Sequence, residues 1–168
     1  GALVKRRGVS IQPLFWGGGQ EQELRPGTLP VPLIVGFAAA ADLAHADLET
    51  WQQQLTLLRD RLWQGLKSRH PQLEMNGAHQ PRLAHNLNIT IADVSGVRLH
   101  RCLKRSLACS SGSACSRGEP SHVLQAIGRS RREAEASLRL SLGRTTTAAE
   151  IDRAVDVISA CINQLHGS

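Results

Sequence analysis

The chain has 168 residues, which allows one or two small domains built around one good hydrophobic core. Its hydrophobic content of 41% and charged content of 20% are ordinary for a soluble globular protein. The formal charge of +6 raises the question of nucleic-acid binding, but the arginines and lysines are spread along the chain and are not interleaved with aromatic residues. We therefore expect no direct nucleic-acid role.

The four cysteines do not form a pattern that binds metal. The gaps between Cys102, Cys109, Cys115 and Cys161 are seven, six and 46 residues, which do not match zinc spacings, so we expect no metal site. Cys161 falls on the apolar stripe of one expected helix and Cys102 lies inside another, so both are interpreted as free buried thiols. Free thiols indicate a reducing, cytoplasmic setting. The longest apolar stretch, 33–41, is too short to span a bilayer, and we expect no membrane partner.

In chain order, the first clear signal is a loop rich in glycine and proline at 17–30. Two glycine turns and two prolines exclude regular structure there. Such a loop can present backbone N–H groups and the Thr28 hydroxyl to an anion. The sequence lacks the G-x-x-x-x-G-K-[ST] pattern of a Walker loop, so a phosphate contact and an ordinary surface loop both remain open.

Two helical segments follow the loop. Residues from Pro32 to about Ala44 are alanine-rich and apolar, which suits close packing against other helices. Asp47 then caps a second helix or stands in a continuation of the first. This second segment has one apolar face, formed at three- and four-residue steps by Leu48, Trp51, Leu55, Leu58, Leu62 and Leu66. Pro71 ends it, and residues 75–82 are expected to be loop.

The second half alternates short strands and helices. Residues 86–91 alternate strictly between polar and apolar and predict a strand, 97–104 a short helix, and 107–109 a second short strand. Residues 137–143 alternate again, and a capping box at Thr147 begins a final amphipathic helix. This order predicts an α/β sandwich of about three strands packed with helices.

Two residues stand out as candidates for chemistry. Cys115 lies within a run of small residues, 110–118, which favours an accessible loop where thiols react; a plain flexible linker remains the alternative. Arg139 lies on the face of its strand opposite Leu138 and Leu140. It is either an exposed strand arginine or a guanidinium aimed into a cleft, where it can bind a carboxylate with two hydrogen bonds.

Several segments together resemble a known family. They occur in order and at fitting distances: 17–21, Arg25-x-Gly27-Thr28, 86–91, 110–115, 119–124 and 138–144. Over nearly the whole chain they are similar to the C-terminal part of a cysteine desulfurase, a class V aminotransferase-like enzyme that uses pyridoxal phosphate. The resemblance implies that residues 1–30 end the large cofactor domain of a fold-type I enzyme. Residues 31–168 would hold connecting helices and the small C-terminal domain with its cysteine loop.

The resemblance also implies a role for particular residues. Cys115 matches the nucleophile that takes sulfur from the substrate, and Arg139 matches the arginine that binds the substrate carboxylate. Thr28 matches a threonine that reaches the cofactor phosphate of the neighbouring subunit, which implies a homodimer, and Gly18 and Gly19 would lie close to it. The family's cofactor lysine stands in a Ser-x-His-Lys segment, which this sequence lacks. We therefore expect the chain by itself to be inactive.

The implied reaction removes sulfur from L-cysteine, giving L-alanine and a persulfide on Cys115. An acceptor protein would take that sulfur for iron–sulfur cluster assembly or tRNA thiolation. Two alternatives stay open: a selenocysteine lyase or another class V aminotransferase-like enzyme, and a dimerisation module without catalysis. Fold alone does not separate them. Loss of activity without Cys115 would favour the desulfurase.

Overall fold

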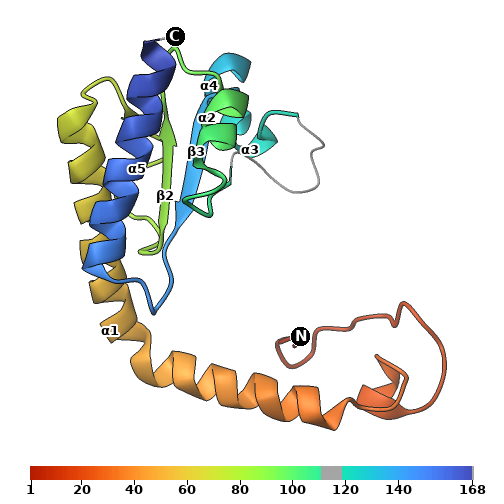
Figure 1. Ribbon diagram of the computed structural model, residues 1–168. Coiled ribbons are helices and arrows are strands. Elements are labelled where there is room, and N and C mark those ends of the chain that lie inside the picture. Colours follow the sequence, from red (N-terminus) through yellow and green to blue (C-terminus); the bar gives the residue numbers. More distant parts are fainter. Residues whose placement is uncertain (111–118, 168) are drawn as a thin grey trace. The chain divides into compact units, whose positions relative to one another are not determined.

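The computed structural model describes residues 1–110 and 119–167 (Figure 1). Contacts within the chain divide it into two compact units, Gly1–Leu48 and Glu49–Ser168. The two units are considered separately below. The domain boundary expected at residue 30 stays a prediction.

The first unit is largely irregular up to residue 30, as its glycines and prolines predict. A 3₁₀ turn, η1 (Gln20–Glu23), interrupts the loop. Glu21, Gln22 and Glu23 all have positive φ, a left-handed conformation that side chains disfavour. The amide of Gly27 donates a hydrogen bond of 3.1 Å to Oε1 of Gln20, which closes the loop around this turn.

The two helical segments form a single long helix, α1 (Val31–Arg69), so of the two alternatives for Asp47 the structure shows the continuation of the first helix. Residues 44–47 contain neither glycine nor proline, so nothing interrupts the backbone hydrogen bonds near Asp47. By length and composition alone, α1 could cross a membrane, because it holds an 18-residue window of mean hydropathy 1.4 that is not buried. The expectation that the apolar stretch is too short to span a bilayer was therefore wrong by the criterion of helix length and composition. A helix covered by other protein meets the same criterion.

The second unit contains an antiparallel sheet in the order β1-β2-β3, formed among the described residues by β1 (Glu74–Met75), β2 (Asn86–Thr90) and β3 (Ser137–Ser141). The strands predicted at 86–91 and 137–143 are confirmed. The strand predicted at 107–109 is wrong: only Ser110 pairs there, in an isolated bridge with Arg139. The expected loop at 75–82 instead begins with the end of β1, which is too short to show alternation.

Helices pack against the apolar face of this sheet. Figure 1 shows α5 (Ala148–His166) beside β2 and the last turns of α1. The predicted capping box is present, since the Thr147 hydroxyl accepts from the amide of Glu150 and the Glu150 carboxylate accepts from that of Thr147. The core residues from strands and helices form one cluster, which includes Leu62, Leu66, Leu87, Ile89, Leu138, Leu140, Ile158 and Ile162. The part of this unit that the structure describes also holds three short helices: α2 (Gly96–Leu103), α3 (His122–Ala126) and α4 (Arg131–Glu135).

The other face of the sheet carries a buried polar network. The Asn76 amide nitrogen donates to Oδ1 of Asn88 (2.7 Å) and to Oγ of Ser137 (3.2 Å). Thr90 donates to Oδ1 of Asn76 (3.0 Å), and its hydroxyl lies 2.9 Å from that of Ser137. These bonds join the end of β1 to β2 and β3. They fix the strand register, because shifting a strand by one residue would leave buried polar groups unpaired.

A disulfide joins α2 to α5, which corrects the expectation of free thiols. The Sγ atoms of Cys102 and Cys161 are bonded, and their Cα atoms are 6.0 Å apart. The two helices are neighbours because Leu99 and Leu103 enter the same core as Ile158. That packing brings the cysteines within disulfide distance, although 59 residues separate them in sequence. Cys109 is a free cysteine.

Substitution of Gly96 tests how tightly the start of α2 packs against the end of α4. A Cβ atom there would lie 1.9 Å from the carbonyl oxygen of Glu135, which is backbone and cannot rotate away. We expect Gly96→Ala to destabilise the complete protein by about 3 kcal/mol or more. Gly36→Ala is the control: nothing lies within 4 Å of its position on α1, so it should stabilise by about 0.5–1 kcal/mol. Urea unfolding measures both, and equal midpoints for the two variants would contradict the packing argument.

Candidate functional site

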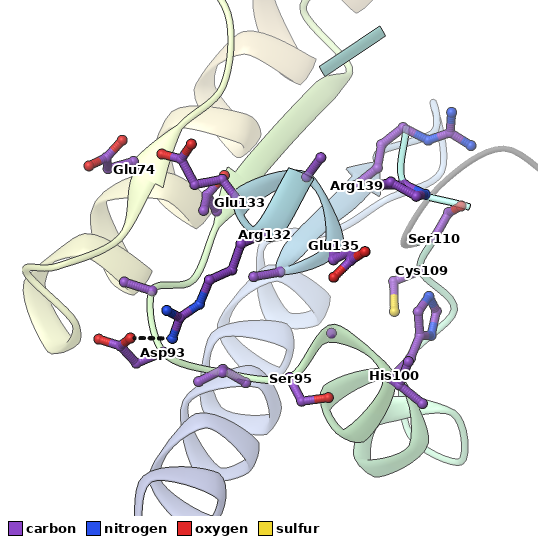
Figure 2. Close-up of a pocket in the computed structure, with 18 of the residues that line it drawn as sticks. Glu74, Asp93, Ser95, His100, Cys109, Ser110, Arg132, Glu133, Glu135 and Arg139 are labelled. Atoms are coloured by element: carbon purple, nitrogen blue, oxygen red, sulfur yellow. Dashed lines mark hydrogen bonds and ion pairs between the residues drawn. The ribbon is translucent and has the colours of Figure 1, made fainter. Parts of the chain in front are cut away.

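The second unit contains an open cavity of about 1100 Å³ on the polar side of the sheet. Its walls come from the end of β2, the start of α2, α4 and β3, and from the chain on either side of 111–118. Figure 2 shows Arg139 and Ser110 together at one end of the cavity, and Arg132 with Asp93 at the other. The cavity therefore gathers residues from segments that are far apart in sequence.

Arg139 is held at this cavity by its own backbone. Its N–H donates to the Ser110 carbonyl (2.6 Å), and its carbonyl accepts from the Ser110 N–H (3.1 Å). On the other edge of β3, Arg139 stands opposite Asn88 of β2. The sequence left two interpretations of Arg139 open, an exposed strand arginine or an arginine at a cleft. The structure shows features of both, since Arg139 is exposed on its strand and also lines a cavity.

The guanidinium of Arg139 differs from the other arginines near the cavity. Arg132 pairs with Asp93 (3.1 Å), and Arg131 pairs with Glu119 (3.3 Å) and Glu135 (3.0 Å). Among the residues that the structure describes, Arg139 has no carboxylate partner. It is therefore placed to bind a carboxylate from a ligand, for which guanidinium geometry is well suited.

The carboxylate of Glu133 is an unsuitable proton donor. Hydrogen bonds from the Ser130 hydroxyl and backbone N–H lower its pKa, and Arg129 acts in the same direction. A carboxyl group with a lowered pKa stays ionised at neutral pH. Its role is structural, because the same bonds cap α4.

Cys115, the candidate nucleophile, lies outside the described residues. The residues that border its segment are described, and both Ser110 and Glu119 line the cavity. The segment that carries Cys115 therefore leaves and rejoins the described structure at the cavity that holds Arg139. Its predicted role as nucleophile stays a prediction.

Cys109 is a second thiol at the cavity, which the sequence analysis did not select. It is half-buried, and burial raises the pKa of its thiol. A raised pKa leaves the thiol protonated at neutral pH, and the protonated form is a poor nucleophile. Figure 2 shows it between Ser110 and His100, at the base of the segment that carries Cys115. Its position indicates a packing role.

The predicted cofactor contacts belong to the first unit. Thr28, Gly18 and Gly19 are exposed there, and the hydrogen bond from Gly27 to Gln20 shapes the loop between them. Exposed hydroxyl and backbone groups fit contact with a phosphate. The structure does not test this role, which stays a prediction.

None of the three lysines suits covalent attachment of a cofactor. The Lys67 ammonium donates to the carbonyls of Pro71 (2.6 Å) and Leu73 (2.7 Å), which cap the turn after α1. Lys5 donates to the carbonyl of Val9, and Lys104 ends α2 on the surface. The contacts of these lysines therefore indicate no site for covalent attachment of pyridoxal phosphate within the 168 residues.

Comparison with known proteins identifies the family. The family model described as aminotransferase class-V matches residues 6–154. The chain belongs to the class-V aminotransferase family. This family implies dependence on pyridoxal phosphate, and the fold confirms the expected class, a partial fold-type I domain.

Class-V relatives named as cysteine desulfurases match the chain almost end to end. A cysteine desulfurase IscS of Rickettsia typhi is 44% identical over 98% of this chain and 41% of its own length. One from Methanosarcina thermophila is 43% identical, with the same coverage of both chains. The chain thus spans about two fifths of the length of these relatives.

Solved structures in the same family agree with the fold. A NifS-like protein superimposes with a TM-score of 0.83 at 31% identity, covering 95% of this chain and 41% of that protein. A NifS-like protein from Rickettsia africae has a TM-score of 0.80 at 27% identity, with coverage of 92% and 41%.

The raised pKa of Cys109 predicts slow alkylation at neutral pH. We expect iodoacetamide to modify Cys109 at pH 7 more slowly than an unperturbed thiol, because burial raises the pKa of the Cys109 thiol and so reduces its thiolate fraction. The rate should rise as the pH is raised, because more of the thiol ionises. Mass spectrometry of the digested protein measures the rate, with a free cysteine-containing peptide as control. A rate equal to that of the peptide would contradict the effect of burial.

Proposed function

We propose that the complete protein is a cysteine desulfurase, which removes sulfur from L-cysteine to give L-alanine and a persulfide on Cys115. The observation that supports this most directly is the placement of Arg139. It lacks a carboxylate partner among the described residues and lines the cavity at which the Cys115 segment begins and ends. The identity of 44% to a cysteine desulfurase supports the same reaction.

In this proposal Arg139 orients the substrate. Its guanidinium binds the α-carboxylate of cysteine with two parallel hydrogen bonds, which restrict rotation of the substrate as well as its position. The backbone bonds to Ser110 keep the strand in place while the guanidinium engages the ligand. Bound pyridoxal phosphate would supply the electron withdrawal that weakens the bonds around the substrate Cα.

Cys115 then performs the sulfur transfer. Its thiolate attacks the substrate sulfur, so a sulfur–sulfur bond forms while the Cβ–sulfur bond of the substrate breaks. The electron pair of the broken bond stays with the substrate carbon, which gains a proton and leaves as alanine. The enzyme keeps the sulfur as a persulfide, and an acceptor thiol removes it.

Other parts of the proposal concern the complete protein. Thr28, with Gly18 and Gly19, would contact the cofactor phosphate of a neighbouring subunit in a homodimer, and the lysine that binds the cofactor would lie outside these 168 residues. The chain alone would then be inactive. The acceptor would be a protein that uses the sulfur for iron–sulfur cluster assembly or tRNA thiolation.

Substitution of Cys115 tests the proposed reaction. We expect Cys115→Ser in the complete protein to abolish release of alanine and sulfide from L-cysteine, because a hydroxyl cannot accept sulfur as a persulfide. The absorbance of bound cofactor should be unchanged. Cys109→Ser is the matched control and should retain activity, since burial keeps that thiol protonated. Full desulfuration by the Cys115→Ser variant would disprove the proposed role of Cys115.

Substitution of Arg139 tests substrate binding. We expect Arg139→Lys to raise KM for L-cysteine by about tenfold or more, because one ammonium cannot replace a two-pronged contact to a carboxylate. Arg132→Lys is the control: Arg132 lines the same cavity but is paired with Asp93, so KM should hardly change. Steady-state kinetics measure both, and an unchanged KM for Arg139→Lys would argue against carboxylate binding.

A further inference from the structure

The surface of α2 carries an uninterrupted group of positive charges beside the cavity. We define the α2 basic face as Arg98, Arg101, Lys104 and Arg105, all of which are exposed. No acidic residue occurs between Val94 and Ser110. The first three recur at three-residue steps, which places them on one side of the helix, while Leu99 and Leu103 enter the core on the other.

In the part of the chain that the structure describes, these cations lack the carboxylate partners that six other arginines of this unit have. Most of its other arginines are paired with carboxylates: Arg59, Arg61, Arg69, Arg129, Arg131 and Arg132. Within the described chain, no carboxylate lies within ion-pair distance of any cation of the α2 basic face. Four like charges within the eight residues 98–105 repel one another, so a ligand of opposite charge would lower the energy of this face.

The α2 basic face also lies close to the segment that carries Cys115. The chain runs from Arg105 to Ser110 in five residues, and Ser110 pairs with Arg139 at the cavity. His100, on the same helix, lines that cavity. A partner bound to the basic face would therefore be held near Ser110, after which the segment that carries Cys115 begins.

We infer that the α2 basic face docks an acidic protein surface next to the thiol that accepts sulfur. This inference rests on the proposed function and specifies its partner. A protein is favoured over single-stranded nucleic acid because no Phe, Tyr or Trp occurs from Val94 to Ser110, and the aromatic ring of His100 lines the cavity. Charge complementarity of this kind raises the rate of encounter and makes that rate fall with salt.

Sulfur transfer to defined peptides tests the inference. The complete holoenzyme is first loaded with persulfide from radiolabelled L-cysteine. The probe is a synthetic peptide with one cysteine flanked by four glutamates, and its control carries glutamines instead. At low ionic strength we expect the glutamate peptide to accept sulfur about tenfold faster, and this advantage should largely disappear at 0.5 M salt, where the Debye length is only about 4 Å.

Charge reversal then locates the effect. Arg101→Glu should reduce the advantage of the glutamate peptide about fivefold, and Arg101→Gln should reduce it less. Arg153→Glu is the matched control, because Arg153 is an exposed arginine on α5 that has no ion pair with any described residue, and its reversal changes the net charge by the same amount. This control should keep the full advantage.

The outcomes separate the docking inference from the proposed function. Alanine release with dithiothreitol as sulfur acceptor should be equal in wild type, Arg101→Glu and Arg153→Glu, which also shows that the variants fold. If wild type releases no alanine, the proposed function fails and the docking inference fails with it. If alanine is released but Arg101→Glu keeps the full peptide advantage, only the docking inference is overturned. Competition distinguishes RNA from an acidic protein. If oligo(U) inhibits sulfur transfer to the glutamate peptide more strongly than polyglutamate of equal charge, and Arg101→Glu removes this inhibition, the docking inference is overturned in favour of RNA.

Discussion

The candidate site depends on hydrogen bonds along both edges of β3. Because the N–H and carbonyl of Arg139 both bond to Ser110, Arg139 forms with Asn88 of β2 the kind of antiparallel pair that exchanges no backbone hydrogen bonds. The same strand is thus joined to the sheet on one edge and to the start of the Cys115 segment on the other. Any shift of β3 would move the guanidinium and this starting point together.

The sheet resists such a shift for two physical reasons. Leu138 and Leu140 are buried on one face, so a slip by one residue would expose them and bury Arg139. On the other face, the amide of Asn76 joins Asn88 of β2 to Ser137 of β3. An apolar core and a satisfied polar network therefore favour the same register, and only Arg139 among the arginines near the cavity is left without a carboxylate in the described chain.

Charge is distributed unevenly around the cavity. The arginines of α4 and of the turn before it are neutralised by neighbouring carboxylates, which stabilises the cavity wall and leaves it little net charge. Within the described chain the cations of the α2 basic face have no such neighbours; Arg101, Lys104 and Arg105 lie at or just after the last turn, where the helix dipole favours positive charge, whereas Arg98 lies in the first turn. The stability of α2 explains why a cation stands in its last turn. It does not explain why no acidic residue occurs among the seventeen residues 94–110.

The sequence by itself determined the elements that depend on local patterns. Alternation predicted β2 and β3, the Thr147 capping box predicted the start of α5, and ordered motifs predicted the family. Tertiary structure alone decided the features that join distant segments: the disulfide across 59 residues, the two-residue strand β1, and the pairing of Ser110 with Arg139. The reason is that periodicity records which side of an element is buried, whereas contacts between elements depend on how the whole core packs.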